Sequence, residues 1–131
     1  MRILFVCTEN ANRSQMAEAF ARMYGKGSVE AASAGSRPGA GVNPKAVAAM
    51  AELGYDLSAH RPKGLEEIGS EPWDCVVTMG CGDACPGVPA KRRIEWELPD
   101  PKALPPEEYR KVRDEIGRRV RQLLANLQRL P

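Results

Sequence analysis

The chain has 131 residues, 43% of them hydrophobic, which suits one globular domain with a packed core. Its 19 Lys and Arg and 17 Asp and Glu give a net charge of +2, which argues against nucleic acid or an anionic membrane as a partner. No stretch approaches the roughly 18 apolar residues of a membrane-spanning helix, and the apolar start is too short for a signal peptide. We therefore expect one domain over residues 1–131, monomeric and cytoplasmic.

Hydrophobic patterning predicts strands that alternate with helices along the chain. Buried strands are indicated by short apolar runs, and helices by apolar residues at spacings of three and four. Capping residues and glycines mark the helix ends. The predicted strands span residues 2–7, 28–35, 73–80 and 92–98, and the predicted helices run from Arg13 to about Gly25, from Pro44 to Gly54, and from Pro105 onward.

This alternation predicts an α/β fold with a four-stranded parallel sheet covered on both faces. Ligands of such open sheets bind beyond the carboxyl ends of the strands. Cys7, the Gly80-Cys81 pair and Asp100 all follow predicted strands. The residues best suited to chemistry are therefore expected at one edge of the sheet.

The segment "CTENANR" places a thiol and an arginine around a loop that leads from a strand into a helix. The first N–H groups of that helix have no partner within the helix, and they attract anions. The same groups and Arg13 favour the thiolate form of Cys7, which makes it a nucleophile. Arg13 can also bind two oxygens of a tetrahedral oxyanion.

A C-x5-R pattern is short, so a buried small cysteine and a surface arginine are an alternative interpretation. The context favours the functional one, because the pattern follows an apolar strand and opens a helix. Ser14 either hydrogen-bonds the thiolate or caps the helix. Asn10 either fixes the loop or tolerates an unusual turn.

The stretch "VCTENANRSQMAEAF" resembles the phosphate-binding loop of the low-molecular-weight protein tyrosine phosphatases and of the thioredoxin-coupled arsenate reductases with the same fold. The likeness extends through "SAGSRPGAGVNPKAVAAMAELGYDLSAHRP" to "PDP" near residue 100. It implies a flavodoxin-like sheet and oxyanion chemistry. It also implies that the oxyanion is bound by the loop residues Thr8, Glu9, Asn10, Ala11, Asn12, Arg13 and Ser14.

The resemblance places Asp100 as the general acid, although a turn residue is the alternative. Phosphotyrosine phosphatases commonly carry an aromatic residue after the following proline, whereas this chain has Lys102. The absence of that ring argues against phosphotyrosine as the substrate.

The segment "MGCGDACP" bears on the choice between reduction and ester hydrolysis. A phosphatase needs one cysteine, whereas a reductase needs further thiols to supply two electrons. Cys81 and Cys85 can act as the second and third thiols, because their spacing in a helical turn is within disulfide reach. Better-known members of the family have a longer loop between their two redox cysteines. Inert thiols and a zinc site remain alternative interpretations of Cys81 and Cys85. Cys75 is expected in the core, and the only histidine, His60, in a loop.

The sequence and the resemblance thus predict an arsenate reductase of the thioredoxin-coupled type, with weak phosphatase activity beside it. Its expected catalytic residues are Cys7, Arg13, Asp100, Cys81 and Cys85, and no metal or cofactor is expected. Its expected partners are arsenate or phosphate and a reductant, either thioredoxin, a glutaredoxin-like protein or a small thiol. Two alternatives stay open. One is a phosphatase with incidental cysteines, and the other is a non-enzymatic thiol sensor of arsenite or metal.

Overall fold

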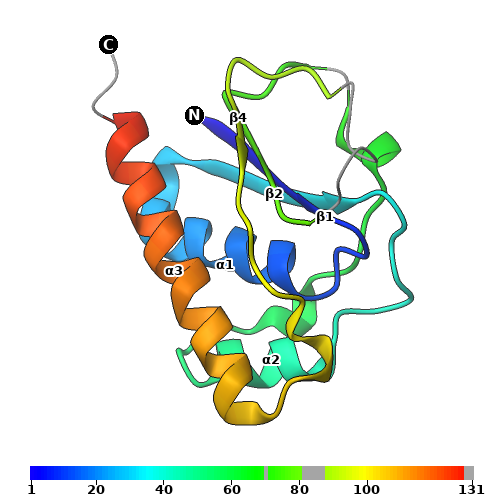
Figure 1. Cartoon of the computed structure of the whole chain (residues 1–131). Coiled ribbons are helices and arrows are strands. Elements are labelled where there is room, and N and C mark those ends of the chain that lie inside the picture. Colours follow the sequence, from blue (N-terminus) through cyan, green and yellow to red (C-terminus); the bar gives the residue numbers. More distant parts are fainter. Residues whose placement is uncertain (70, 81–87, 129–131) are drawn as a thin grey trace.

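The computed structural model describes residues 1–69, 71–80 and 88–128. Strands and helices alternate along these residues, as the sequence predicts (Figure 1). The strands are β1 (Arg2–Cys7), β2 (Glu30–Gly35), β3 (Cys75–Thr78) and β4 (Arg93–Glu95), and the α-helices are α1 (Arg13–Gly25), α2 (Pro44–Ala51) and α3 (Pro106–Gln128). Short 3₁₀ helices are η1 (Lys26–Ser28), η2 (Leu57–Ala59), η3 (Leu65–Ile68) and η5 (Pro101–Ala103).

The strands form one parallel sheet in the order β2-β1-β3-β4. This order is that of a flavodoxin-like sheet, so the predicted fold class is confirmed. The observed strands β2, β3 and β4 are shorter than the predicted ones. β3 ends at Thr78 because Gly80 takes a positive φ of 80°, which turns the chain away from the sheet.

Helices lie on both faces of the sheet. The three α-helices cover the face that carries Ile3, Phe5 and Val77, where they build the main core. On the opposite face Leu4 and Val6 belong to a smaller cluster, against which side chains of η3 pack. Because successive residues of a strand point to opposite faces, β1 is buried on both sides and contains no charged residue after Arg2.

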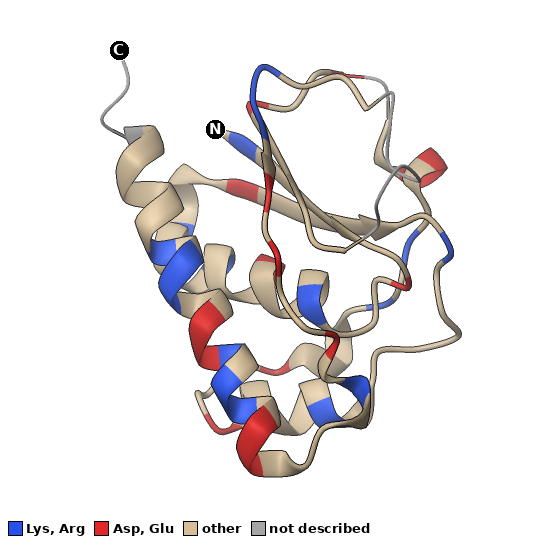
Figure 2. Ribbon diagram, viewed as in Figure 1, with Lys and Arg blue, Asp and Glu red and all other residues tan. Residues whose placement is uncertain are grey.

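The terminal helix α3 is amphipathic. Figure 2 shows acidic and basic residues interspersed along it, as expected for a solvated face. The apolar positions predicted to face the core are all buried: Tyr109, Val112, Ile116, Val120, Leu123 and Leu127. Cys75 is also fully buried, which confirms its predicted place in the core.

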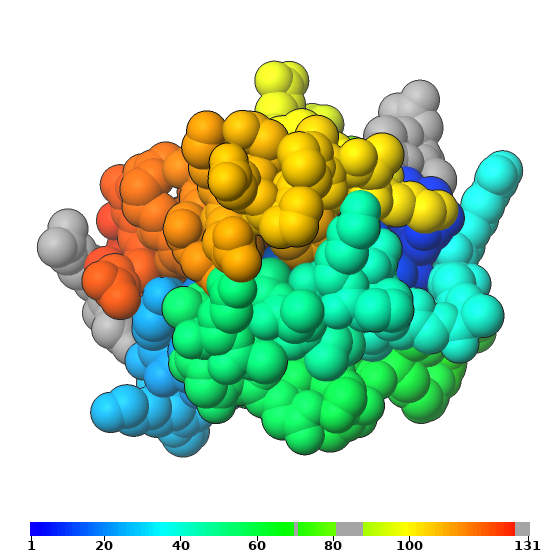
Figure 3. All heavy atoms as spheres, turned by 90° about the horizontal axis from the view of Figure 1, so that it is seen from below, coloured from blue at the N-terminus to red at the C-terminus, as the bar shows by residue number. Residues whose placement is uncertain are grey.

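The carboxyl ends of β1 and β3 and the segment after β4 meet at one edge of the sheet. Seen from below, the blue N-terminal loop lies between the yellow segment near residue 100 and the cyan segment near residue 40 (Figure 3). The residues predicted to carry chemistry at this edge thus come from distant parts of the sequence. Among the described residues, no helix combines the length and the apolar character that crossing a membrane requires.

Candidate active site

Cys7 is the last residue of β1, and its side chain is almost fully buried. Its Sγ lies 2.8 Å from the Oγ of Ser14, in the first turn of α1. The Nδ2 of Asn10 donates to the same Oγ at 2.7 Å. Since an amide nitrogen can only donate, Ser14 accepts from Asn10 and keeps its own proton for the sulfur. Ser14 therefore supports a negative charge on Cys7.

Asn10 fixes the loop between β1 and α1. Its backbone is left-handed, with φ of 54°, a conformation that asparagine tolerates better than most residues. Its Oδ1 accepts from the backbone N–H of Lys63 at 2.9 Å and from the Nε2 of Gln15 at 3.0 Å. Both functions considered for Asn10 from the sequence are thus combined in one residue.

The carbonyl groups of the loop are occupied by the segment at residues 37–43. The carbonyls of Thr8, Glu9 and Ala11 accept backbone N–H bonds from residues 37, 39 and 43, at 2.8, 2.9 and 3.0 Å. Carbonyl oxygens would repel an anion. Because these carbonyls are bonded to the 37–43 segment, the loop is suited to present its N–H groups to an oxyanion.

Arg13 begins α1 and is buried. One guanidinium nitrogen donates to the carbonyl of Leu98 at 3.0 Å, which orients the side chain. Gly80 lies against the same group, and a Cβ at that position would come within 2.7 Å of it. The glycine is needed both for its positive φ and for the room that it leaves to Arg13.

Replacing Gly80 by alanine should therefore displace the guanidinium. We expect oxyanion turnover to fall about 100-fold, the usual scale for losing one positioned donor. The matched control is Gly54→Ala, because Gly54 also has a positive φ, of 83°, but open space around it. Equal kinetics of the two variants, measured with any active substrate, would show that backbone strain alone explains the effect of Gly80→Ala.

Asp100 precedes η5 and is exposed at the rim of the site. Its Oδ1 accepts from the backbone N–H of Lys102 at 3.0 Å. From α2, the Nζ of Lys45 donates to the carbonyls of Lys102 and Leu104 at 2.9 and 3.2 Å, and it holds this segment against the helix. The Nζ of Lys102 also lies 3.5 Å from a carboxylate oxygen of Glu9. This ion pair links the segment that carries Asp100 to the loop between β1 and α1.

These elements surround a hollow of about 380 Å³, large enough for a tetrahedral oxyanion. It is lined by Cys7, Thr8, Glu9, Ala11, Asn12, Arg13, Gly80 and Asp100. The structure thus brings the predicted nucleophile, arginine and acid to one hollow, with Asn10 and Ser14 behind the loop. Cys81 and Cys85 lie outside the described residues, although Gly80, directly before Cys81, lines the hollow.

Gln15 connects the loop to a histidine that the sequence did not assign to the site. Its Nε2 donates to the Oδ1 and the carbonyl of Asn10 and to the carbonyl of Arg61, each at 3.0 Å. Its Oε1 therefore accepts from the Nδ1 of His60 at 2.9 Å. The Nε2 of His60 then accepts from the Tyr55 hydroxyl at 2.7 Å. His60 is fixed as a neutral ring protonated at Nδ1.

A buried carboxylate lies beside this ring. Glu18 accepts from the Ser33 hydroxyl at 2.7 Å and from the Nε of Arg22 at 2.9 Å. The Nδ1 of His60 and the Nζ of Lys63 lie 3.5 and 3.9 Å from its oxygens. Partners on several sides allow this charge to remain buried.

The burial of His60 predicts a loss of stability in acid. Burial lowers the pKa of His60, as do Arg22 and Lys63, while Glu18 and Asp56 act in the opposite direction. The unfolded chain then takes up a proton near pH 6.5 that the folded chain does not, so the stability contributed by this group is full above pH 6.5 and falls below it. We expect His60→Gln to flatten the fall in unfolding free energy from pH 7 to 5.5. Parallel curves for the two proteins in urea titrations would contradict this.

Among the described residues, no group of three or more His, Cys, Asp or Glu is placed to hold a metal ion. The described residues instead bring a thiol and an arginine to a loop that is suited to an anion, at the edge of a flavodoxin-like sheet. This combination defines a class of proteins that act on tetrahedral oxyanions through a cysteine nucleophile.

The family model "Low molecular weight phosphotyrosine protein phosphatase" matches residues 2–130, and the chain belongs to this family. It is 35% identical to a glutaredoxin arsenate reductase of Synechocystis, over 96% of this chain and 98% of that protein. It is 41% identical to an arsenate reductase of Halalkalibacterium halodurans, over 91% of each chain.

Solved structures of arsenate reductases are also similar to this chain. An arsenate reductase in a phosphate-binding state superposes with a TM-score of 0.88 at 34% identity, covering 95% of this chain and 97% of that one. A thioredoxin-dependent arsenate reductase of Corynebacterium glutamicum superposes with a TM-score of 0.80 at 37% identity, covering 97% of this chain and 61% of that one. The family resemblance expected from the sequence is confirmed.

Proposed function

We propose that this chain reduces arsenate to arsenite. The observation that carries the proposal is the position of the Cys7 thiol, 2.8 Å from the Ser14 hydroxyl at a hollow that Arg13 and Asp100 also line. A thiolate there faces a tetrahedral oxyanion held by the loop and the arginine. The names of the relatives support arsenate as that oxyanion.

In the first step the sulfur of Cys7 forms a bond to arsenic. An arsenic–oxygen bond breaks, and the oxygen leaves as water after Asp100 supplies a proton. Arg13 and the loop N–H groups stabilise the charge on the remaining oxygens. The product is a covalent adduct in which arsenic is still As(V).

In the second step the thiolate of Cys81 attacks the sulfur of Cys7. The sulfur–arsenic bond breaks, and its electron pair stays on arsenic, which leaves as As(III) arsenite. The two cysteines are thereby oxidised to a disulfide. Cys85 then attacks Cys81, which frees Cys7 and moves the disulfide to the outer pair.

An external thiol must return two electrons to that pair. The relatives' names include both glutaredoxin and thioredoxin, so both reductants are candidates for this chain. We propose that residues 1–131 form one domain that carries all of these steps.

The test is arsenate-dependent NADPH oxidation, coupled either to thioredoxin and its reductase or to glutathione, glutaredoxin and glutathione reductase. We expect turnover with at least one system. Hydrolysis of p-nitrophenyl phosphate is measured beside it. Hydrolysis without any NADPH oxidation would favour the phosphatase that the family's name suggests. Arsenite binding without turnover would favour a sensor.

A further inference from the structure

Asn12 directly precedes α1 and occupies its N-cap position. Asparagine at this position usually accepts a bond from the second or third N–H of its own helix. Asn12 makes no such side-chain bond, and its backbone (φ −130°, ψ −88°) lies outside the extended region typical of N-caps. The N–H groups that it would cap belong to the helix end that faces the oxyanion hollow. A capping side chain would therefore compete with the ligand.

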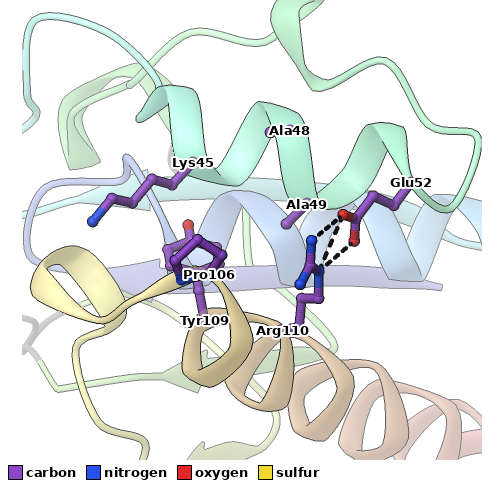
Figure 4. Close-up of a pocket in the computed structure, with 7 residues that line it drawn as sticks. All are labelled: Lys45, Ala48, Ala49, Glu52, Pro106, Tyr109 and Arg110. Atoms are coloured by element: carbon purple, nitrogen blue, oxygen red, sulfur yellow. Dashed lines mark hydrogen bonds and ion pairs between the residues drawn. The ribbon is translucent and has the colours of Figure 1, made fainter.

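Tyr109 of α3 holds the Asn12 side chain elsewhere. Its hydroxyl donates to the Oδ1 of Asn12 at 2.7 Å, the oxygen that a cap would use. The phenol is only 2% exposed, and burial raises the pKa of Tyr109, so the hydroxyl remains a donor at all ordinary pH values. In Figure 4 Tyr109 projects from the start of α3 toward α2, beside Pro106. Its ring lines a small cleft of about 110 Å³ between these two helices.

We propose that Tyr109 is a positioning residue that keeps the anion site open by preventing Asn12 from capping α1. The inference rests on the proposed function only in requiring that the hollow binds an oxyanion. On this proposal Tyr109, at the start of α3, raises the affinity for the oxyanion without contacting it. The Asn12 side chain then acts as an internal competitor, and Tyr109 restrains it.

The first experiment measures the affinity for inorganic phosphate by titration calorimetry. Tyr109→Phe keeps the ring and removes only the hydroxyl, and we expect about tenfold weaker binding, the scale of one lost or gained cap. Tyr24→Phe on α1 is the matched control and should bind like the parent chain. Unchanged affinity in folded Tyr109→Phe would overturn the proposal.

A double-mutant cycle identifies the competitor. Whatever the affinity of Asn12→Ala, adding Tyr109→Phe to it should cause no further change, because the capping side chain is already gone. The same tenfold loss in the Asn12→Ala background would show that Tyr109 acts by another route.

Amide hydrogen exchange separates capping from a loosened loop. In the ligand-free Tyr109→Phe protein, the N–H of Ser14 or Gln15 should exchange more slowly, because Asn12 now accepts from it. Equal or faster exchange at both positions would contradict self-capping. These readouts need no arsenate turnover, so this inference can fail while the proposed function stands, and the reverse also holds.

Discussion

Replacing Cys7 by serine should abolish arsenate reduction and phosphate-ester hydrolysis together, each by about 10⁴-fold or more. A serine hydroxyl is far harder to ionise than a thiol, so it remains a poor nucleophile at neutral pH. Steady-state assays of both reactions measure the effect.

Binding of phosphate by the Cys7→Ser protein is the control. The loop and Arg13 remain in place, so calorimetry should still detect the oxyanion. Retained turnover in either assay would remove Cys7 from the mechanism. Loss of both turnover and binding, with a lowered melting temperature, would point to a damaged loop.

Replacing Cys81 by serine should separate the two reactions. Arsenite release is expected to stop, because no thiol then attacks the Cys7 sulfur. Hydrolysis of p-nitrophenyl phosphate should be nearly unchanged, because water completes that reaction. Cys85→Ser should behave differently from Cys81→Ser. It should release one arsenite per protein and then stop, with Cys7 and Cys81 joined in a disulfide.

Cys75→Ala is the matched cysteine control for this pair of variants. Cys75 lies fully buried in β3, and burial raises the pKa of its thiol to about 11, so it is an inert core residue. Both activities should survive this substitution, with a modest loss of stability. Equal loss of arsenite release in Cys75→Ala and Cys81→Ser would contradict an ordered relay and would favour a shared metal or arsenite site.

Much of the fold could be predicted because its signals are local. The apolar run at β1 and the spacing of Ile116 and Val120 in α3 each report burial directly from neighbouring residues. The loop from Cys7 to Arg13 is equally local, since strand, thiol, arginine and helix start lie within a few positions. The end of β3 was less predictable, because Gly80 turns the chain through a positive φ that the hydrophobic pattern does not encode.

The buried polar residues behind the loop, Gln15, Glu18 and His60, could not be predicted from such local signals. The apolar positions of α1 define one buried face, yet Gln15 and Glu18 on its other sides are buried as well. Their partners lie far along the chain, with Arg61 and His60 more than 40 positions from Gln15. The Tyr109 bond to Asn12 spans 97 positions. Such contacts depend on the tertiary fold and leave no periodic signal.

The most direct test of the central claim is to count arsenite in a single turnover. The fully reduced protein is mixed with excess arsenate without any external reductant, and arsenite and disulfides are then quantified by speciation analysis and mass spectrometry. The account predicts one arsenite per protein, with Cys7 free and Cys81 joined to Cys85. Absence of arsenite from a reduced protein that still binds phosphate would contradict it.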